Sequence, residues 1–393
     1  AAMRNVGAKA IVTTSHVGGT AHARIAMQVT SELFPVRHIC AYGTDLPDGV
    51  VPLDDVFNAG QTPAIPRSPR SGNAADHVAV ITFDVTSSGL VAAARSHSQL
   101  MAGGSAVFLE AGAARNANIL SAIPASSFAG LAASLLPWLL EGGTLSLHHG
   151  IDPLAFAGQC RTHAGGMIVL PGPALSPLST AGYFSGAATT LVAVWRSPEQ
   201  LATAAGWRGE CNLVDLASFG EIGLIAAHRT ADGLPADIPL GVVGTHHIAG
   251  AGIAANRTRH GTLALRGDMV PVHAFPPGAQ FGHGATLAPD DAGYIDTGYT
   301  CRLDGVSQSL AVTGPPVGVT AVGGYRFRMS EIETQVAAID PSATLMALPG
   351  GLLAQHLAGS APDNVKVQVG LLAQGANPLI AGAFRRRAGA RAA

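Results

Sequence analysis

Lysine is almost absent from this chain of 393 residues, since Lys9 and Lys366 are the only two. Charged residues of all kinds make up 12% of the sequence, about half of the usual globular share. The formal net charge of -2 excludes a general basic field for nucleic acid or an anionic membrane. A surface with so few charges is poorly protected against association. We therefore expect a homo-oligomer or a complex with a partner protein.

Long apolar runs and paired cysteines are also lacking. No stretch of about 20 apolar residues occurs, which argues against a membrane-spanning helix. The four cysteines are far apart and form no CxxC pair, as is typical of free thiols in a reducing compartment. The sequence begins at Ala1 without a charged and apolar leader. Together these absences predict a cytoplasmic protein.

The sequence does contain a large apolar share, 48%, which excludes disorder for most of the chain. Short β-branched segments alternate with segments of helical periodicity. Strands are predicted at 10–14, 37–41, 77–83, 143–147 and 167–170, and helices at 21–33, 90–100, 129–140 and 153–162. This alternation is typical of an α/β fold with a doubly wound, mostly parallel sheet.

The pattern changes after about Gly241, where glycines and prolines separate short strands predicted at 262–265, 270–274 and 309–312. A turn-rich hinge follows at 314–324, and the segment NVKVQVG near the end has the alternation of a strand. We therefore predict three parts: an N-terminal region of two sheet subdomains (1–240), a small β-rich subdomain (241–312) and a reduced C-terminal α/β module (313–393).

A polar loop, Thr86-Ser87-Ser88-Gly89, follows the strand predicted at 77–83. Hydroxyls and exposed amides between a strand and a helix can form a cradle for a phosphate. A plain connection is the alternative, because such loops are common and no lysine lies near this one. Asp84 would also repel a phosphate if its side chain faced the loop.

Six segments, taken in order, resemble the motifs of the adenylate-forming superfamily, which includes acyl-CoA synthetases, AMP-dependent ligases and peptide-synthetase adenylation domains. They are ITFDVTSSGLVAAARSHSQL (81–100), LLEGGTLSLHHGIDP (139–153), LASFGEIGLIAAHR (216–229), GTLALRGDM (261–269), GYIDTGYTCRLDG (293–305) and TGPPVGVTAVGGYRFRMSEIE (313–333). The resemblance covers most of the chain. It implies a divergent member that begins inside the family's first subdomain.

The resemblance implies a reaction in two steps. A carboxylate attacks the α-phosphorus of Mg-ATP and gives an acyl-adenylate and pyrophosphate, and a thiol, usually that of CoA, then takes the acyl group. Such chemistry needs cations and amide donors around the phosphates and a carboxylate for Mg²⁺. The implied ligands are therefore ATP or AMP, Mg²⁺, CoA and a small carboxylic acid.

Candidate nucleotide-binding residues are those that fall on the family's motif positions. They are Thr86, Ser87, Ser88, Gly89, Phe219, Glu221, Thr297 and Tyr299. The resemblance makes Glu221 the Mg²⁺ ligand, and it makes Phe219 a candidate for stacking on adenine, with burial in the core as the alternative. We expect Ser87, Glu221 and Thr297 to converge on a common hollow. An acid would lie near Leu170, Pro171, Gly172 and Phe219.

Several groups that the family's chemistry requires are replaced in this chain. The loop lysine falls at Ala92, the ribose-binding aspartate at Tyr299 and the hinge arginine at Pro315, and Lys366 comes too early for the catalytic lysine. Loss of one preorganised donor typically costs about 3–4 kcal/mol, or about 10²–10³ in rate. We therefore assign no catalytic residue and expect adenylation to be impaired or lost. The alternative is a non-catalytic relative, a pseudoenzyme that binds an acyl or nucleotide ligand or a partner protein.

Overall fold

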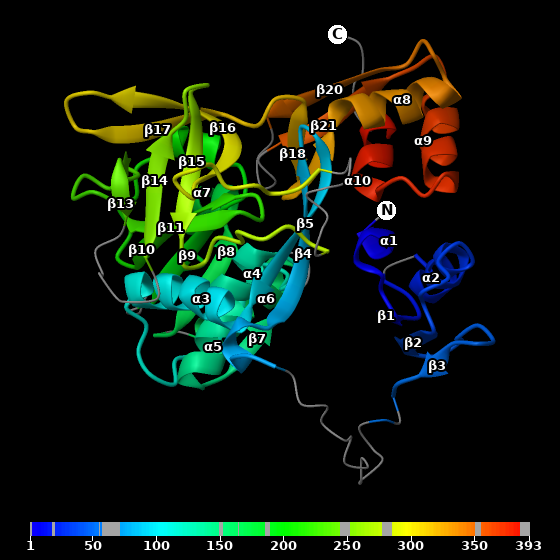
Figure 1. Cartoon of the computed structure of the whole chain (residues 1–393), viewed down its shortest axis with the longest axis horizontal. Coiled ribbons are helices and arrows are strands. Elements are labelled where there is room, and N and C mark those ends of the chain that lie inside the picture. The colour runs from blue at the N-terminus through cyan, green and yellow to red at the C-terminus, as the bar shows by residue number, and fades with distance from the viewer. Residues whose placement is uncertain are drawn as a thin grey trace. The chain divides into compact units, whose positions relative to one another are not determined.

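The computed structural model describes residues 2–17, 20–54, 56, 71–148, 152–163, 165–184, 189–243, 252–276, 285–349 and 355–385 (Figure 1). The chain divides into two compact units. One contains Ala1–Ala74 and Phe275–Gly278, and the other contains Ala75–Ala274 and Ala279–Ala393. In the described ranges no helix is long and apolar enough to cross a membrane.

The first unit contains a small parallel sheet of order β1-β2-β3. Its elements are α1 (Ala2–Val6), β1 (Ala10–Thr14), α2 (His22–Thr30), β2 (His38–Tyr42) and β3 (Val51–Pro52). A small core of Ala23, Ala41 and Val50 joins α2 to the sheet. The two strands and the helix predicted for this region are confirmed within a few residues.

A six-stranded sheet of order β11-β10-β9-β8-β6-β7 forms the centre of the second unit. Its strands are β6 (Ile119–Ser121), β7 (Leu145–Leu147), β8 (Met167–Pro171), β9 (Thr190–Trp195), β10 (Asn212–Phe219) and β11 (Gly223–His228). All neighbouring pairs are parallel except β10 and β11. The mostly parallel arrangement that the sequence predicts is therefore confirmed.

Helices cover both faces of this sheet, as the doubly wound prediction requires. The helices are α3 (His97–Ala111), α4 (Phe128–Gly130), a π-helical turn (Leu131–Leu135), α5 (Leu136–Glu141), α6 (Pro153–Thr162) and α7 (Leu175–Thr180). Val192 packs in the core that contains α3 and α5, whereas its neighbour Leu191 packs in the core that contains α6 and α7. Adjacent strand residues point to opposite faces, so the same strand contributes to both cores.

The helix predicted at 90–100 is wrong over most of its length. Residues Gly89–Ser96 form β5, which pairs antiparallel with β4 (Val78–Thr86). The small residues of this segment favour a helix by propensity, but pairing with β4 overrides it. The helix α3 begins only at His97, where Ser96 and Gln99 form a capping box.

An antiparallel sheet of order β12-β17-β16-β15-β14-β13 follows. Its strands are β12 (Ile238–Pro239), β13 (Gly241–Val243), β14 (Ile253–Arg257), β15 (Thr262–Gly267), β16 (Ile295–Asp304) and β17 (Ser309–Gly314). The strands predicted at 262–265 and 309–312 are confirmed. The strand predicted at 270–274 is wrong, because Val270 closes a turn on Gly267 and Pro271 has no N–H for a sheet ladder.

The C-terminal elements form a small α/β core of their own. They are β18 (Val319–Val322), β19 (Tyr325–Arg328), α8 (Met329–Ile339), β20 (Thr344–Pro349), β21 (Gln355–Ser360), α9 (Asn364–Ala373) and α10 (Pro378–Ala381). The strand predicted for NVKVQVG is wrong, because this segment is α9. Asp363 caps its first turn by accepting from the Lys366 N–H at 3.0 Å, and Val367 and Leu371 bury one face.

Candidate functional site

The predicted phosphate loop is the turn of the β4–β5 hairpin. Thr86 pairs with Gly89, so Ser87 and Ser88 form a tight turn between two strands. The Thr86 hydroxyl oxygen lies 2.9 Å from the Ser88 hydroxyl oxygen and donates to the Gly89 carbonyl at 3.0 Å. The hydroxyl groups of Thr86 and Ser88 therefore form hydrogen bonds within the turn itself. The expected connection from a strand to a helix is wrong here, since β5 follows the turn.

A cavity of about 360 Å³ lies beside Glu221, and we refer to it as the Glu221 cavity. The residues that line it come from β4, the loop before α4, the end of β9, the β10–β11 turn and the β18–β19 hairpin: Ile81, Thr82, Phe83, Asp84, Val85, Ser126, Ser127, Arg196, Ser218, Gly220, Glu221, Gly324, Tyr325 and Arg326. Two arginines and two carboxylates thus face one space. A cavity of this size can hold a small molecule.

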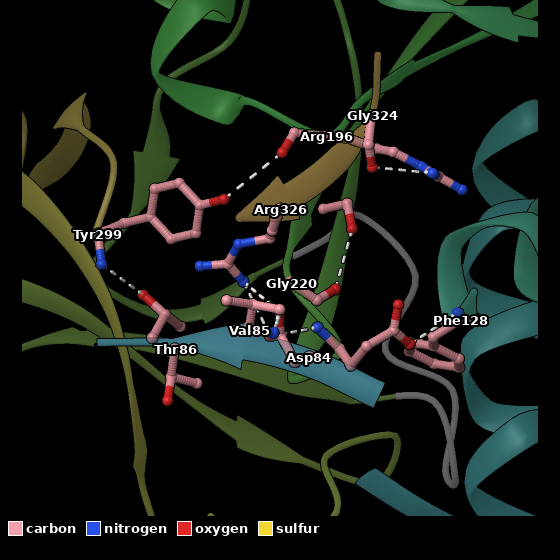
Figure 2. A network of polar contacts seen from close by, with 12 residues as sticks. Asp84, Val85, Thr86, Phe128, Arg196, Gly220, Tyr299, Gly324 and Arg326 are labelled. Carbon is pink, nitrogen blue, oxygen red and sulfur yellow. Dashed lines mark hydrogen bonds and ion pairs between the residues drawn. The ribbon is translucent and has the colours of Figure 1, made fainter. Parts of the chain in front are cut away.

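Asp84 lies at the centre of the polar contacts in this cavity (Figure 2). Arg326 Nη1 donates to its two carboxylate oxygens at 2.6 and 2.8 Å. The Glu221 N–H donates to Asp84 Oδ2 at 2.9 Å, and the Val85 N–H donates to Oδ1 at 2.8 Å. The Asp84 side chain is 3% exposed and that of Arg326 is 11% exposed. The pair is therefore a buried, hydrogen-bonded ion pair that joins β4 to β19.

Glu221, the predicted Mg²⁺ ligand, is a buried carboxylate of the β10–β11 turn. Its Oε2 accepts from the Phe128 N–H, at the start of α4, at 2.8 Å. Burial raises the pKa of Glu221 above its ordinary value, although the Arg95 charge, the Thr82 hydroxyl and the Phe128 N–H lower it. The folded protein therefore favours the neutral form of this side chain more than water does.

The residues beside Glu221 do not fit a Mg²⁺ ion as they are arranged. Both oxygens of Asp84 accept from N–H groups or the Arg326 guanidinium, and one oxygen of Glu221 accepts from Phe128. A Mg²⁺ site needs several free oxygen ligands around an octahedron. Nowhere in the described ranges do three or more histidine, cysteine, aspartate or glutamate side chains form a metal-binding group.

Three arginines around Glu221 were not predicted as site residues. Arg95 on β5 is 1% exposed, donates to the Glu221 and Ile222 carbonyls, and stacks 3.7 Å from the centre of the Phe128 ring. Burial lowers its pKa to about 10, with the charge of Glu221 acting against that shift. A prediction that placed Arg95 in a helix gave no reason to connect it with Glu221.

Arg196 and Arg326 are the other two. Arg196 follows β9 and donates to the Gly324 carbonyl at 3.0 Å and to the Ser127 hydroxyl at 2.6 Å. Burial acts to lower the pKa of Arg326, but Asp84 and Tyr299 outweigh it and the pKa is raised. The last two glycines of the predicted hinge, Gly323 and Gly324, form the turn of the β18–β19 hairpin that carries Arg326.

Phe219, Thr297 and Tyr299 lie in the packed core and do not line the Glu221 cavity. The Phe219 and Tyr299 rings meet edge to face at 5.6 Å, and the Tyr299 hydroxyl donates to the Arg196 carbonyl at 3.5 Å. Thr297 donates to the Leu263 carbonyl at 2.7 Å. Of Ser87, Glu221 and Thr297, only Glu221 lines the cavity, so the convergence expected of these three is not observed.

The four residues expected around an acid do not form one pocket. Leu170 belongs to the core on the α6 and α7 side of the central sheet, whereas Phe219 belongs to the core on the α3 side. The side chains therefore lie on opposite faces. Gly172 lines a separate cavity on the α7 side, and Phe219 does not.

No family model matches the sequence, and no curated protein does. Solved structures do match. A malonyl-CoA ligase in a ternary product complex with methylmalonyl-CoA and AMP superposes with a TM-score of 0.64 at 16% identity, over 97% of this chain and 89% of the ligase chain. The chain has the fold of the adenylate-forming enzymes.

Two further matches share this adenylate-forming fold. The amide bond synthetase McbA from Marinactinospora thermotolerans matches with a TM-score of 0.65 at 16% identity, over 97% of this chain and 76% of McbA. The o-succinylbenzoate CoA synthetase MenE from Bacillus subtilis, as a double mutant bound to a product analogue, matches with a TM-score of 0.61 at 12% identity. This match covers 89% of this chain and 78% of MenE. The resemblance read from the six motif segments is thus confirmed at the level of the fold.

Proposed function

We propose that this protein is a divergent relative of the AMP-forming acyl-CoA synthetases and ligases in which activation of a carboxylic acid is impaired or lost. In this proposal the Glu221 cavity binds a small acyl or nucleotide-like anion. The adenylate-forming fold and the six motif segments support the relationship. The observation that carries the loss of activity is the carboxylate of Asp84 inside the cavity, paired with Arg326.

A triphosphate placed beside Glu221 would meet Asp84 as a second negative charge. Arg326, which lines the same cavity, is already neutralised by that carboxylate at 2.6 Å. Removing one partner from a buried ion pair costs about 3–5 kcal/mol, which corresponds to a loss of more than about 10² in binding. The Thr86 and Ser88 hydroxyls bond within their own turn and offer little compensation.

Arg196 supports the binding of a small anion. It lines the Glu221 cavity, and within the described part of the chain it has no carboxylate partner at ion-pair distance. Guanidinium groups bind carboxylates through paired N–H donors. Ile81 and Phe83 contribute apolar surface to the same cavity. A carboxylate or acyl group of modest size fits this combination of apolar surface and an arginine that is hydrogen-bonded but not ion-paired in the described ranges.

The first test measures acid-dependent pyrophosphate release with a broad panel of carboxylic acids. We expect the protein and its Glu221→Ala variant to give the same background, and calorimetry to detect binding of AMP or an acyl ligand without turnover. Arg196→Gln should abolish that binding, whereas Arg328→Gln, at an exposed pair with Glu331, should preserve it. Acid-dependent release that Glu221→Ala removes would show an active ligase and overturn the proposed loss.

A second test asks whether Asp84 opposes phosphate. Asp84→Asn keeps the shape of the side chain but frees Arg326 to pair with a ligand. We expect AMP to bind about tenfold or more tightly to this variant in calorimetry, because the competing charge is gone. Asp215→Asn is the matched control, since Asp215 is also buried and pairs with Arg229 at 2.7 Å. Equal AMP affinity in wild type and Asp84→Asn would contradict the proposed role.

A further inference from the structure

A second cavity, of about 470 Å³, lies on the α7 side of the central sheet, and we refer to it as the tryptophan cavity. Its lining comes from the turn before α7, both ends of α7, the end of β9, the segment before β10 and the residue after β11: Gly172, Pro173, Leu175, Ser176, Ser179, Thr180, Trp195, Ala204, Ala205, Gly206, Trp207, Arg208, Gly209 and Arg229. It shares no lining residue with the Glu221 cavity. Trp195 and Arg196 are neighbours in sequence, yet they line different cavities.

Both indole rings of the tryptophan cavity are held in place by the protein. Trp195 Nε1 donates to Asp215 Oδ1 at 2.8 Å, and a side chain at Gly172 would overlap the ring. Trp207 Nε1 donates to the Cys211 carbonyl at 3.0 Å, and a side chain at Gly209 would overlap that ring. Rings fixed before binding lose little entropy when a ligand stacks on them.

The lining of this cavity is cationic. Arg208 is exposed, and in the described ranges it has no ion-pair partner. Arg229 is held by Asp215 and by the Ala205 carbonyl. Asp215 itself is 4% exposed and does not line the cavity. The described lining residues thus include two arginines, three hydroxyl side chains and no carboxylate.

We propose that the tryptophan cavity binds a planar aromatic carboxylate. The ring system lies against Trp207, whose side chain is partly exposed and whose face favours an aromatic partner. Trp195 is 6% exposed and packs in the core, so it supports this wall of the cavity and offers little surface for stacking. The carboxylate pairs with Arg208 at the open side, where the guanidinium is free. The volume of the cavity admits a ligand of one or two fused rings. This site is separate from the Glu221 cavity and does not depend on acid activation there.

The test measures binding of 1-naphthoate to the full chain by calorimetry. The uncharged analogue 1-naphthalenemethanol is measured in the same way. Arg208→Gln changes an exposed side chain and leaves the fold intact. We expect it to weaken naphthoate binding about threefold to tenfold and to leave binding of the alcohol unchanged. Trp207→Leu should weaken both probes by about twofold to tenfold. Trp138→Phe, on α5, is the matched control and should change neither.

The outcomes separate clearly. Failure of naphthoate to bind at millimolar concentration would overturn the proposal, as would equal naphthoate affinity in wild type and Arg208→Gln. Loss of naphthoate binding in Arg196→Gln, with Arg208→Gln unaffected, would place the probe in the Glu221 cavity and also overturn it. If circular dichroism shows that Trp207→Leu is unfolded, the comparison of the two probes on Arg208→Gln decides the question by itself.

Discussion

At Gly220 the chain turns from β10 into β11 with φ at 59°, in the left-handed region. A Cβ atom there would overlap Asp84 Oδ2 and Arg326 Nη1. The buried ion pair therefore leaves no space for a side chain at this position. Glycine is therefore required here both by its backbone conformation and by the space that the Asp84–Arg326 pair occupies.

Gly220→Ala tests the two contributions together. We expect it to lower the free energy of unfolding by about 2–4 kcal/mol, because strain in the backbone adds to overlap with a buried ion pair. Gly375→Ala is the control, since φ there is 74° but the added Cβ meets nothing within 4 Å. It should cost only about 1 kcal/mol in the same urea titration. Equal losses in the two variants would show that the space around Gly220 is not tight.

The burial of Glu221 should make the stability of the protein depend on pH. Its folded-state pKa is raised by burial, so the folded state binds the proton more tightly than the unfolded chain does. The stability that follows is present below the ordinary pKa of 4.5 and is lost as the pH rises through the raised value. Replacing Glu221 by glutamine removes this titration. The unfolding free energy of Glu221→Gln, relative to wild type, should therefore increase as the pH rises above 4.5.

The measurement is a series of urea unfolding curves between about pH 4 and pH 8. Glu333→Gln, at an exposed position of α8, is the control and should follow the wild-type slope. A difference between Glu221→Gln and wild type that stays constant across this range would contradict a raised pKa.

Sequence alone located Glu221 but not its neighbours. The motif around Glu221 is local, so a single segment carries the signal. Arg95, Arg196 and Arg326 come from three other segments, and Asp84 and Arg326 are 242 positions apart. Nothing in a linear pattern shows that their side chains converge. The sequence therefore predicted a site depleted of positive charge, whereas the structure places three arginines around Glu221, of which Arg95 is fully buried.

Among the elements, α6 and β1 were predicted with their observed bounds because periodicity and caps agree with the fold. Two segments were predicted with the wrong structure. The alanines of β5 favour a helix, but this segment forms a strand, and the alternating valines of α9 favour a strand, but this segment forms a helix. Partners that are distant in sequence, β4 for β5 and the core around Ile332 for α9, decide the outcome.

The side-chain cap of α9 should contribute to the stability of the protein. Asp363→Ala removes the carboxylate that accepts from the Lys366 N–H. We expect a loss of about 0.5–2 kcal/mol in unfolding free energy, with Asp363→Asn close to wild type because asparagine also caps. The measurement is thermal or urea unfolding followed by circular dichroism. A full loss in Asp363→Asn would show that charge, and not capping, matters here.

At the scale of the whole molecule, the Asp84–Arg326 pair connects the C-terminal hairpin to β4. Arg326→Gln leaves Asp84 buried without its cation, and we expect a loss of about 3–5 kcal/mol in stability. Hydrogen exchange should show the lost protection concentrated in β18 and β19. The double variant Asp84→Asn with Arg326→Gln should recover part of the loss, whereas Arg328→Gln should have little effect. Unchanged exchange in Arg326→Gln would show that the pair does not hold the hairpin.

The 242 positions between the two partners also matter while the chain is being made. Asp84 leaves the ribosome long before Arg326 exists, and until then its carboxylate has no arginine from β19 to neutralise it. The β4–β5 hairpin can therefore complete its burial only after β19 has been synthesised, late in translation. A product that stops before β19 would keep the Asp84 carboxylate without the arginine that neutralises it in the complete chain.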